Sequence, residues 1–321
     1  MVRALPEAAA RGKFELPRSY KPCLTPRKRA AARSLPPTPP LQGRMLAVTE
    51  WQGSTGEAWA EEWRRTDRTL APLNEALLAR ALPFQGRRIL DVGCGAGATS
   101  FAFADALPGA EVTGLDLSEA LVDAARARTG ERTNVRFVLG DAARWTPDSG
   151  RFDLAVSRHG VMFFDDPVAA FTHLHALAPY GRLLFSCFRA PRENEWMVAM
   201  SGLIERHAPE ALAGPEPAAG PFAFADPARI EDVLRGAGFA PPVIEPFDFD
   251  FHVGAGEDPV ADALGYFRRI GPMARLLAHA DPSVKDAILA DLADLAAARV
   301  TAQGVGFRAA AWLVTSRAGT G

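Results

Sequence analysis

The feature that most constrains the fold is a regular alternation of strand-like and helix-like segments between residues 88 and 188. The predicted strands are 88–92, 111–116, 134–139, 152–157 and 182–188, and the predicted helices are 99–107, 119–128 and 167–178. Ser118 is a suitable N-cap for the second of these helices. Strands joined by helical crossovers pair in parallel, so the pattern predicts a parallel sheet with helices on both faces.

A glycine-rich turn follows the first predicted strand. Gly93, Gly95 and Gly97 remove every second side chain from this turn, so a ligand can contact the backbone and the N–H groups at the start of the next helix. The pyrophosphate of a dinucleotide fits such a turn, and Ala98 completes a GxGxxA pattern. The amino-acid end of S-adenosylmethionine fits it as well, so the turn alone leaves both ligands open.

Three aspartates stand at or after the ends of the first three predicted strands. Asp91 precedes Gly93 by two residues, and its carboxylate would repel a pyrophosphate but attract an ammonium or a sulfonium. Asp116 can accept hydrogen bonds from both ribose hydroxyls, which fits NAD and S-adenosylmethionine equally. Asp141 is placed to accept the exocyclic amine of adenine, while the Ala142 N–H donates to the ring.

Five motifs follow one another in order and cover nearly all of this region. They are RILDVGCGAGATS, VTGLDLSEALVDAARAR, VRFVLGDAARW, FDLAVSRHGVMFFDDP and LAPYGRLLFSCF. From about Trp51 to Arg317 the chain resembles the class I S-adenosylmethionine-dependent methyltransferases, nearest to the small-molecule enzymes of ubiquinone and menaquinone biosynthesis. The resemblance implies a Rossmann-like α/β fold, with a seven-stranded sheet of order 3-2-1-4-5-7-6 and strand 7 antiparallel.

The resemblance also implies an activity, in which a methyl group moves to an oxygen or carbon of a small organic acceptor. S-adenosylmethionine would be the donor and S-adenosylhomocysteine the product, and no metal is expected. The predicted cofactor-binding residues are Asp91, Gly93, Gly95, Gly97, Asp116, Leu117, Asp141, Ala142, Ser157 and Arg158. The acceptor itself cannot be derived from the motifs.

Two positions depart from the pattern of the family. Tyr180 stands where the family usually has a second glycine in a turn, and we expect little functional effect there. The sequence SRHG at 157–160 stands where many enzymes that methylate amines of nucleic acids and proteins carry Asn/Asp-Pro-Pro-Tyr. Those enzyme classes are therefore disfavoured.

A few side chains with reactive groups have two interpretations each. His159 is a candidate general base with a pKa near the working pH, or else a packed or substrate-lining histidine. Cys94 fits a small turn residue better than a nucleophile, because no base stands at local spacing. His173 and His175 are two positions apart on a helix and face different ways, so they do not form a metal-binding pair.

Aromatic residues also leave two roles open. A helical pattern over 49–82 carries three tryptophans, which either cover the sulfonium by cation–π attraction or simply pack the helix on the sheet. A second aromatic set either lines an apolar acceptor pocket or belongs to the core. The two sets are Trp51, Trp59 and Trp63, and Met162, Phe163, Phe164, Phe222 and Phe224.

The rest of the chain falls into a tail and a domain. Residues 1–44 are basic and rich in proline, which predicts a disordered extension. The alternative is that this segment is a nucleic-acid tether or a transit peptide. Met45 is a candidate for the true start codon. Residues 45–321 form the predicted methyltransferase domain, with a core at about 84–190, a lid and acceptor-binding part at 191–300, and a last strand at 305–316. Two helices are predicted within that lid, over 258–278 and 281–298.

Composition narrows the classes of function further. The net charge is −2, and ten basic residues against two acidic ones in 1–44 leave the remaining chain acidic, which suits small molecules better than nucleic acid. Three cysteines without a CxxC pair indicate neither a disulfide framework nor a structural zinc site. With no apolar run long enough to span a membrane, we expect a cytoplasmic protein. A NAD-dependent oxidoreductase and a non-catalytic S-adenosylmethionine-binding protein are the rival hypotheses.

Overall fold

The computed structural model describes residues 51–84, 86–212 and 219–319, so the predictions for segment 1–44 and Met45 lie outside the described residues. The helices are α2 (Ser54–Glu61), α3 (Trp63–Thr69), α4 (Ala71–Ala81), α5 (Ala98–Ala106), α6 (Glu119–Arg128), α7 (Pro167–Leu177), α8 (Glu195–His207), α9 (Pro227–Gly236), α10 (Pro259–Phe267), α11 (Pro272–His279) and α12 (Pro282–Ala297). Short 3₁₀ turns are η1 (Leu82–Phe84), η2 (Gly160–Phe163), η3 (Pro191–Glu193) and η4 (Pro209–Leu212). The strands are β1 (Arg88–Val92), β2 (Glu111–Asp116), β3 (Val135–Leu139), β4 (Leu154–Arg158), β5 (Arg182–Phe188), β6 (Val243–Gly254), β7 (Val300–Thr301) and β8 (Gly304–Arg317).

The strands form one mixed sheet of order β3-β2-β1-β4-β5-β8-β6. The first five strands pair in parallel, and β8 runs antiparallel to both β5 and β6. This arrangement confirms the predicted order, with β8 as the antiparallel seventh strand. The two-residue strand β7, which pairs with β8, is an addition to the prediction.

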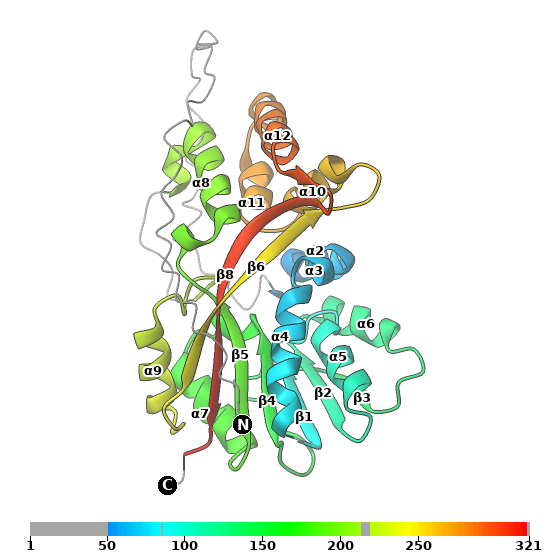
Figure 1. The fold of residues 1–321 in the computed structure, drawn as a ribbon, viewed down its shortest axis with the longest axis vertical. Helices are drawn as coiled ribbons and strands as arrows, with labels where there is room; N and C mark the ends of the chain where they lie inside the picture. The colour runs from blue at the N-terminus through cyan, green and yellow to red at the C-terminus, as the bar shows by residue number, and fades with distance from the viewer. Residues whose placement is uncertain (1–50, 85, 213–218, 320–321) are drawn as a thin grey trace, which may run out of the picture. The chain divides into compact units, whose positions relative to one another are not determined.

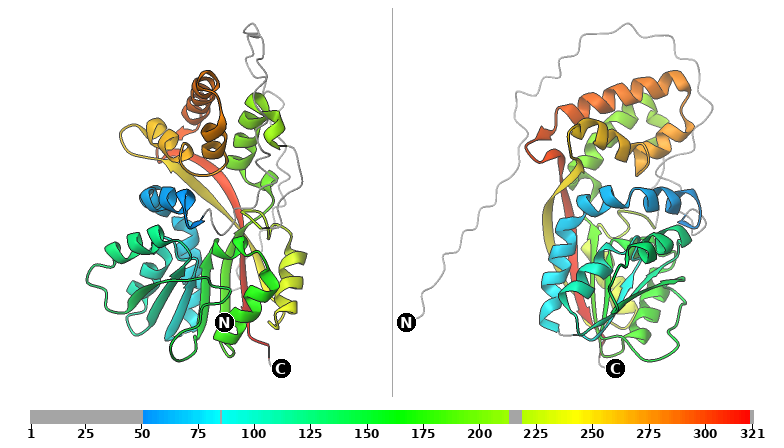
Figure 2. Two further views of the ribbon diagram at one scale, coloured as in Figure 1. Left: turned by 180° about the vertical axis from the view of Figure 1, so that it is seen from behind. Right: turned by 90° about the vertical axis from the view of Figure 1, so that its right-hand side faces the viewer.

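Helices cover the sheet on both faces, as predicted. Strand β4 is buried at four of its five positions and β5 at six of seven; burial on both sides of a strand is typical of parallel sheets. Helix α4 lies in front of the sheet in Figure 1, whereas α7 lies in front of it when the molecule is seen from behind in Figure 2. The carboxyl ends of the parallel strands are left to form a site.

Two predicted helices are interrupted in the structure. The pattern over 49–82 becomes α2, α3 and α4, with breaks at Glu62 and Leu70, whose backbones leave the helical conformation. The helix predicted over 258–278 is wrong as a single element, because α10 ends at Phe267 and α11 begins after Gly271. Gly271 has φ +83, a left-handed conformation that a helix cannot continue through.

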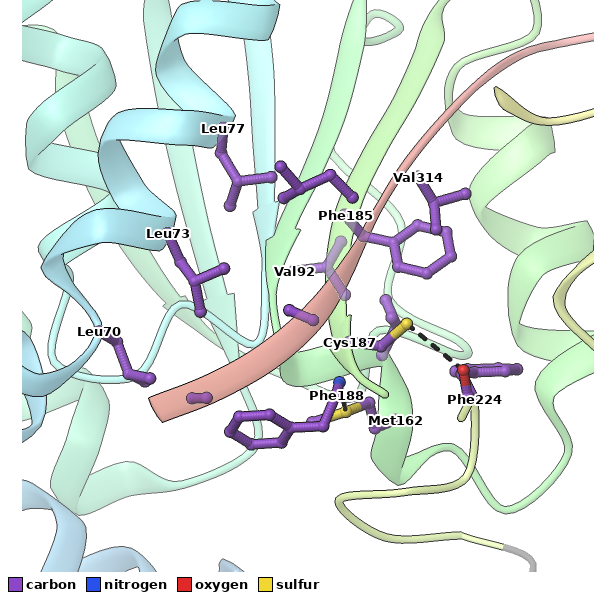
Figure 3. Close-up of a cluster of buried hydrophobic side chains, with 14 of the residues drawn as sticks. Leu70, Leu73, Leu77, Val92, Met162, Phe185, Cys187, Phe188, Phe224 and Val314 are labelled. Carbon is purple, nitrogen blue, oxygen red and sulfur yellow. Dashed lines mark hydrogen bonds between the residues drawn. The ribbon is translucent and has the colours of Figure 1, made fainter. Parts of the chain in front are cut away.

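The core lies between α4 and the strands and continues beneath the site. Leu73 and Leu77 project from α4 toward the sheet, where Phe185 is fully buried (Figure 3). Phe224 is also core, since it is 2% exposed and its backbone carbonyl lies 3.7 Å from Cys187 Sγ. Of the two roles open to Phe224, packing in the core is therefore the correct one.

Strands β6 and β8 extend beyond the parallel strands, and α8, α10, α11 and α12 gather around that extension (Figure 1). Helices α8 and α10 of the predicted lid region 191–300 pack on this pair of long strands, since α10 contacts β6 and α8 contacts β8. The same region also contains β6, which is a strand of the sheet, and α9, which packs on α7, so not all of it forms a lid. Within the described part of the chain, no helix combines the length and the apolar character that a membrane crossing needs.

Candidate cofactor site

A cavity of about 480 Å³ opens at the carboxyl ends of the parallel strands, where ligands bind in open α/β sheets. The strand ends contribute Gly93, Asp116, Gly140, Arg158 and Phe188, while α2 and α3 contribute Trp59, Trp63, Thr66 and Asp67. Trp196, Phe251, Tyr266 and Phe267 enclose it from the lid region. Its size and aromatic lining are typical of small-molecule sites.

The three glycines of the turn serve three different purposes, although all have positive φ (67°, 55° and 91°). A Cβ on Gly93 would lie 2.9 Å from the Gly160 backbone, and one on Gly97 would lie 2.8 Å from the Phe101 and Phe137 rings. A Cβ on Gly95 would meet nothing within 4 Å. Gly93 and Gly95 line the cavity, so Gly95 is the position where bare backbone faces open space in the cavity.

Asp116 lies at the end of β2 and braces this turn. Its Oδ2 accepts the Gly95 N–H at 2.8 Å, and its Oδ1 accepts the Ser118 N–H at 2.9 Å. Burial raises the pKa of Asp116, while these backbone hydrogen bonds act to lower it. Each carboxylate oxygen keeps a second lone pair, so the side chain can still accept ribose hydroxyls in the cavity that it lines.

Asp91 and Arg158 are two buried, oppositely charged side chains on the adjacent strands β1 and β4. Asp91 Oδ2 accepts the Ser100 hydroxyl at 2.6 Å, but its Oδ1 is buried without a partner, and so is Arg158 Nη1. Burial raises the pKa of Asp91 to about 6, against the Ser100 hydrogen bond and the charge of Arg158. Arg158 lines the cavity, whereas Asp91 is fully buried beneath it.

Helix α3 is connected to the glycine turn through Arg128, at the end of α6. The Arg128 guanidinium donates to the Ala96 carbonyl at 2.5 Å and to Asp67 at 2.6 Å, and lies 3.5 Å from the centroid of the Trp63 ring. The other oxygen of Asp67 is 3.9 Å from Arg158. Neither Asp67 nor Arg128 was predicted from the sequence, because no local pattern marks a contact across more than sixty residues.

The remaining predicted cofactor residues lie in two positions. Asp141, Ala142 and Leu117 line the cavity, and Asp141 also accepts the Ala143 N–H at 2.9 Å within its own turn. Ser157 is 1% exposed and lies outside the lining, where its hydroxyl donates to the Val92 carbonyl at 2.7 Å. Its role visible in the structure is to join two loops of the site.

His159 lines the cavity in a strained conformation. It is the one non-glycine residue of the described chain with positive φ, at 66°. Its Nδ1 lies 3.0 Å from Ser186 Oγ, its ring centroid lies 4.1 Å from that of Phe188, and its Nε2 is buried without a partner. Burial lowers the pKa of His159 to about 3, which differs from the value near working pH that a general base would need.

The cavity lining distinguishes the aromatic residues that border the site from those that do not. All three tryptophans line the cavity, as do the residues of 162–164, whereas Phe222 and Phe224 do not.

Burial raises the pKa of the Cys94 thiol well above its ordinary value, in agreement with a turn residue. Among residues 51–84, 86–212 and 219–319, no cluster of three or more His, Cys, Asp or Glu side chains is arranged to hold a metal.

Comparisons with known proteins agree with this geometry. Residues 89–181 match a family model described as a methyltransferase domain. Nocamycin O-methyltransferase of Saccharothrix syringae is 34% identical over 180 residues, which are 52% of this chain and 64% of that protein. Ubiquinone biosynthesis O-methyltransferase of Coxiella burnetii is 33% identical over 117 residues, 36% of this chain and 49% of the relative. The YcgJ protein of Bacillus subtilis aligns with a TM-score of 0.45 and 19% identity, covering 73% of this chain and 93% of that one.

The alignments span between 49% and 64% of the two O-methyltransferases, so the chain matches only part of each relative. The family model matches residues 89–181, which include the glycine turn. The strand order and the placement of Asp116 at the end of β2 are those that the motifs predicted. The matched family model, the two relatives and the strand order together indicate a class I S-adenosylmethionine-dependent methyltransferase.

Proposed function

We propose that the protein transfers a methyl group from S-adenosylmethionine to an oxygen or carbon of a small organic acceptor. The observation that carries this proposal is the unpaired, buried pair of Asp91 Oδ1 and Arg158 Nη1 beside the glycine turn. A buried polar atom without a partner costs free energy, so a ligand that supplies the partner is favoured. The methionine end of the donor carries an ammonium and a carboxylate, which match this pair in sign.

The other residues of the cavity fit the remaining parts of the donor. Asp116 would accept the ribose hydroxyls, and Asp141 with the Ala142 N–H would hold the adenine. Gly95, where a Cβ would meet no protein atom within 4 Å, leaves room for a ligand at the backbone. The ammonium would reach Asp91 through a water molecule, because this carboxylate lies beneath the cavity lining.

S-adenosylmethionine supplies an already activated methyl group. The protein therefore has to align the acceptor with it, exclude water and stabilise the charges. The aromatic lining supports this role: Trp51 lies 5.7 Å from Trp59 and 5.0 Å from Phe163 between ring centroids, and all three line the cavity. Such faces exclude water and also attract a sulfonium.

An oxygen acceptor is supported by the names of the relatives, which are O-methyltransferases of nocamycin and of ubiquinone biosynthesis. A small molecule is supported by the enclosed cavity and by its acidic lining, since Asp67, Asp116 and Asp141 all border it. Nucleic acid would be repelled by such a surface. We also infer a cytoplasmic location, which is the one expected from the amino-acid sequence.

The test is transfer of labelled methyl from S-adenosylmethionine over a panel of phenols, quinols and polyketides. We expect labelled product with at least one acceptor, and loss of product in Asp116→Ala but not in Asp123→Ala, an exposed position on α6. If S-adenosylhomocysteine binds tightly but no acceptor is labelled, the protein is a non-catalytic binder and the proposed activity is wrong.

A further inference from the structure

Three buried side-chain nitrogens without hydrogen-bond partners belong to residues that line the cavity. Nε1 of Trp51, Nε1 of Trp196 and Nε2 of His159 are all buried and unpaired, and all three residues line the cavity. An indole nitrogen can only donate. The site therefore selects a ligand that presents acceptor oxygens, and it disfavours an amine, which would add further donors.

The rings of His159 and Trp196 both pack against one aromatic ring, that of Phe188. The Phe188 centroid is 4.1 Å from that of His159 and 5.5 Å from that of Trp196. Trp196 is held in turn by Phe251, at 5.4 Å and an interplanar angle of 17°. Phe188, Trp196 and Phe251 thus form a fixed apolar wall against which a planar molecule can pack.

The contact with Ser186 determines which nitrogen of His159 carries the proton. Ser186 is fully buried, and its hydroxyl makes one hydrogen bond within the described chain, to His159 Nδ1 at 3.0 Å. If Nδ1 carried the proton, the Ser186 hydroxyl hydrogen would be left without an acceptor among the described residues, at a cost of about 1–3 kcal/mol. The favoured tautomer has the Ser186 hydroxyl donating to Nδ1, so Nε2 carries the hydrogen and is a donor.

We propose that His159 and Trp196 hold the methyl-accepting oxygen as its anion, a phenolate or enolate, and that no base on the protein removes its proton. The inference rests on the proposed function and names the class of acceptor: planar phenols or enols acidic enough to ionise on binding. Ser186 is a positioning residue, because it acts through the ring of His159.

The charges balance without a protein base. The acceptor loses its proton to solvent as it binds, the sulfonium S–C bond breaks, and an O–C bond forms with an electron pair of the anionic oxygen. The sulfur keeps the electron pair of the broken bond, so the positive and negative charges cancel. The low pKa of His159 agrees with a ring that stays neutral throughout.

No carboxylate of the described residues makes a hydrogen bond or ion pair with His159, although five aspartates share its cavity. Arg158, its sequence neighbour, further lowers the pKa of the ring. Ser186 and Phe188 of β5 pack directly against it and carry no charge. The titratable and charged side chains that share its cavity are Asp67, Cys94, Asp116, Asp141, Arg144, Arg158, Asp165, Asp166 and Tyr266.

The first experiment needs no acceptor. Nitrogen-15 spectra of the full chain with S-adenosylhomocysteine report the protonation of both ring nitrogens between pH 5 and 8. We expect a proton on Nε2 and none on Nδ1 over the whole range, with that distinction weakened in Ser186→Ala. Protonation of the ring with a midpoint near pH 6.5, or a proton on Nδ1, would overturn the inference.

The second experiment follows kcat/KM against pH for a nitrophenol, which ionises near neutrality, and for the unsubstituted phenol, which ionises near pH 10. The midpoint is expected to follow each acceptor, and His159→Phe to lower kcat/KM on the order of 10²-fold, as for loss of an oxyanion donor. His159→Gln, which keeps an N–H at a similar reach, should recover part of the rate. One midpoint shared by both acceptors and abolished in His159→Phe would show a protein base and contradict the proposal.

A matched control is available in His175→Phe. His175 also has a buried, unpaired Nε2, but its ring packs at 5.1 Å against Phe239 outside the cavity lining. This variant should keep the wild-type rate. If S-adenosylhomocysteine does not bind at all, the proposed function itself fails; if it binds and methyl is transferred while His159 titrates near neutrality, only this inference fails.

Discussion

Single glycines of the turn have separable effects, although their spacing suggests one shared role. Gly95 borders the cavity with φ +55, and a Cβ there would meet no protein atom within 4 Å. Gly97, with φ +91, is held against two phenylalanine rings instead. The proposed ligand would account for the first glycine, and packing of α5 against β3 explains the second.

Gly95→Ala is therefore expected to impair binding, and Gly97→Ala to impair folding. The first change places a methyl group where the ligand approaches, so the affinity for S-adenosylhomocysteine should fall on the order of tenfold or more, about 1.4 kcal/mol. Its left-handed backbone should cost only about 1–2 kcal/mol of unfolding free energy. In Gly97→Ala the same strain is joined by clashes with Phe101 and Phe137.

Calorimetry and denaturant unfolding of the two variants measure the difference. We expect the larger loss of affinity in Gly95→Ala and the larger loss of unfolding free energy in Gly97→Ala. Equal behaviour of the two variants in both measurements would show that the turn acts as a unit.

The buried carboxyl of Asp91 makes stability depend on pH in a defined direction. Its pKa is raised from 3.8 to about 6 in the folded state. Below the unfolded value both states hold the proton. As pH rises from about 4 to about 6, the folded state loses stability because the unfolded state releases this proton while the buried carboxyl retains it. The total effect is about 3 kcal/mol.

Asp91→Asn removes this titration. As pH rises from about 4 to about 6, the unfolding free energy of the wild type should therefore fall relative to that of the variant. Binding of S-adenosylhomocysteine should strengthen over the same range in the wild type, because the ligand ammonium favours the ionised carboxylate. Denaturant unfolding and calorimetry at pH 4.5 and 7 measure both effects. Asp123→Asn, an exposed position, is the control; equal pH profiles for the wild type and Asp91→Asn would refute this role.

At the level of elements, α3 is the part of the structure that joins the lid to the glycine turn. One face of α3 contributes Trp63, Thr66 and Asp67 to the cavity. On its other side, Arg65 and Arg68 both pair with Asp262 of α10, at 2.6 and 2.7 Å. The helix is thus held from two directions, by the lid at Asp262 and by the glycine turn through Arg128.

Arg128→Met tests the connection to the turn. It removes the hydrogen bonds to Ala96 and Asp67 as well as the contact with Trp63. We expect weaker binding of S-adenosylhomocysteine by about 1–3 kcal/mol, as for hydrogen bonds to a charged group. Amide hydrogen exchange should quicken in residues 63–69.

Arg132→Met is a closely matched control for this change. Arg132 also pairs with a carboxylate, Asp105 at 2.6 Å, and lies 4.7 Å from the Phe101 ring, but it is outside the cavity lining. Its replacement should leave affinity and exchange in α3 unchanged. If both variants behave alike, the effect of Arg128 is general loss of stability and not support of the turn.

Local signals predicted most of the elements in the parallel half and missed those that depend on tertiary contacts. The strands from β1 to β5 and the helices α5, α6 and α7 follow from short periodic segments and from caps such as Ser118, which accepts the Leu121 N–H. The interruption at Gly271 was missed although the dipeptide Gly271-Pro272 is a local signal typical of a turn. The strand β7 is too short to leave a pattern.

At the scale of the whole molecule, the site joins residues from nearly every part of the described chain. The residues proposed to bind the cofactor come from motifs in 88–158, and the sequence analysis named them one by one. The role of each residue in binding stays a prediction. The proposed acceptor half draws on Trp196, Phe251 and Tyr266, which belong to three separate elements and share no motif. Only the folded arrangement brings them together in the lining of one cavity, so sequence alone could not have found them.

Calorimetric titration of the full chain with S-adenosylhomocysteine and, separately, with NAD tests the central claim most directly. We predict one bound S-adenosylhomocysteine per chain, no binding of NAD, and an affinity weaker by about 1–3 kcal/mol in Asp116→Ala, because hydrogen bonds to a charged acceptor are lost. Asp123→Ala should bind as the wild type does. Binding of NAD without S-adenosylhomocysteine, or an unchanged affinity in Asp116→Ala, would contradict the claim.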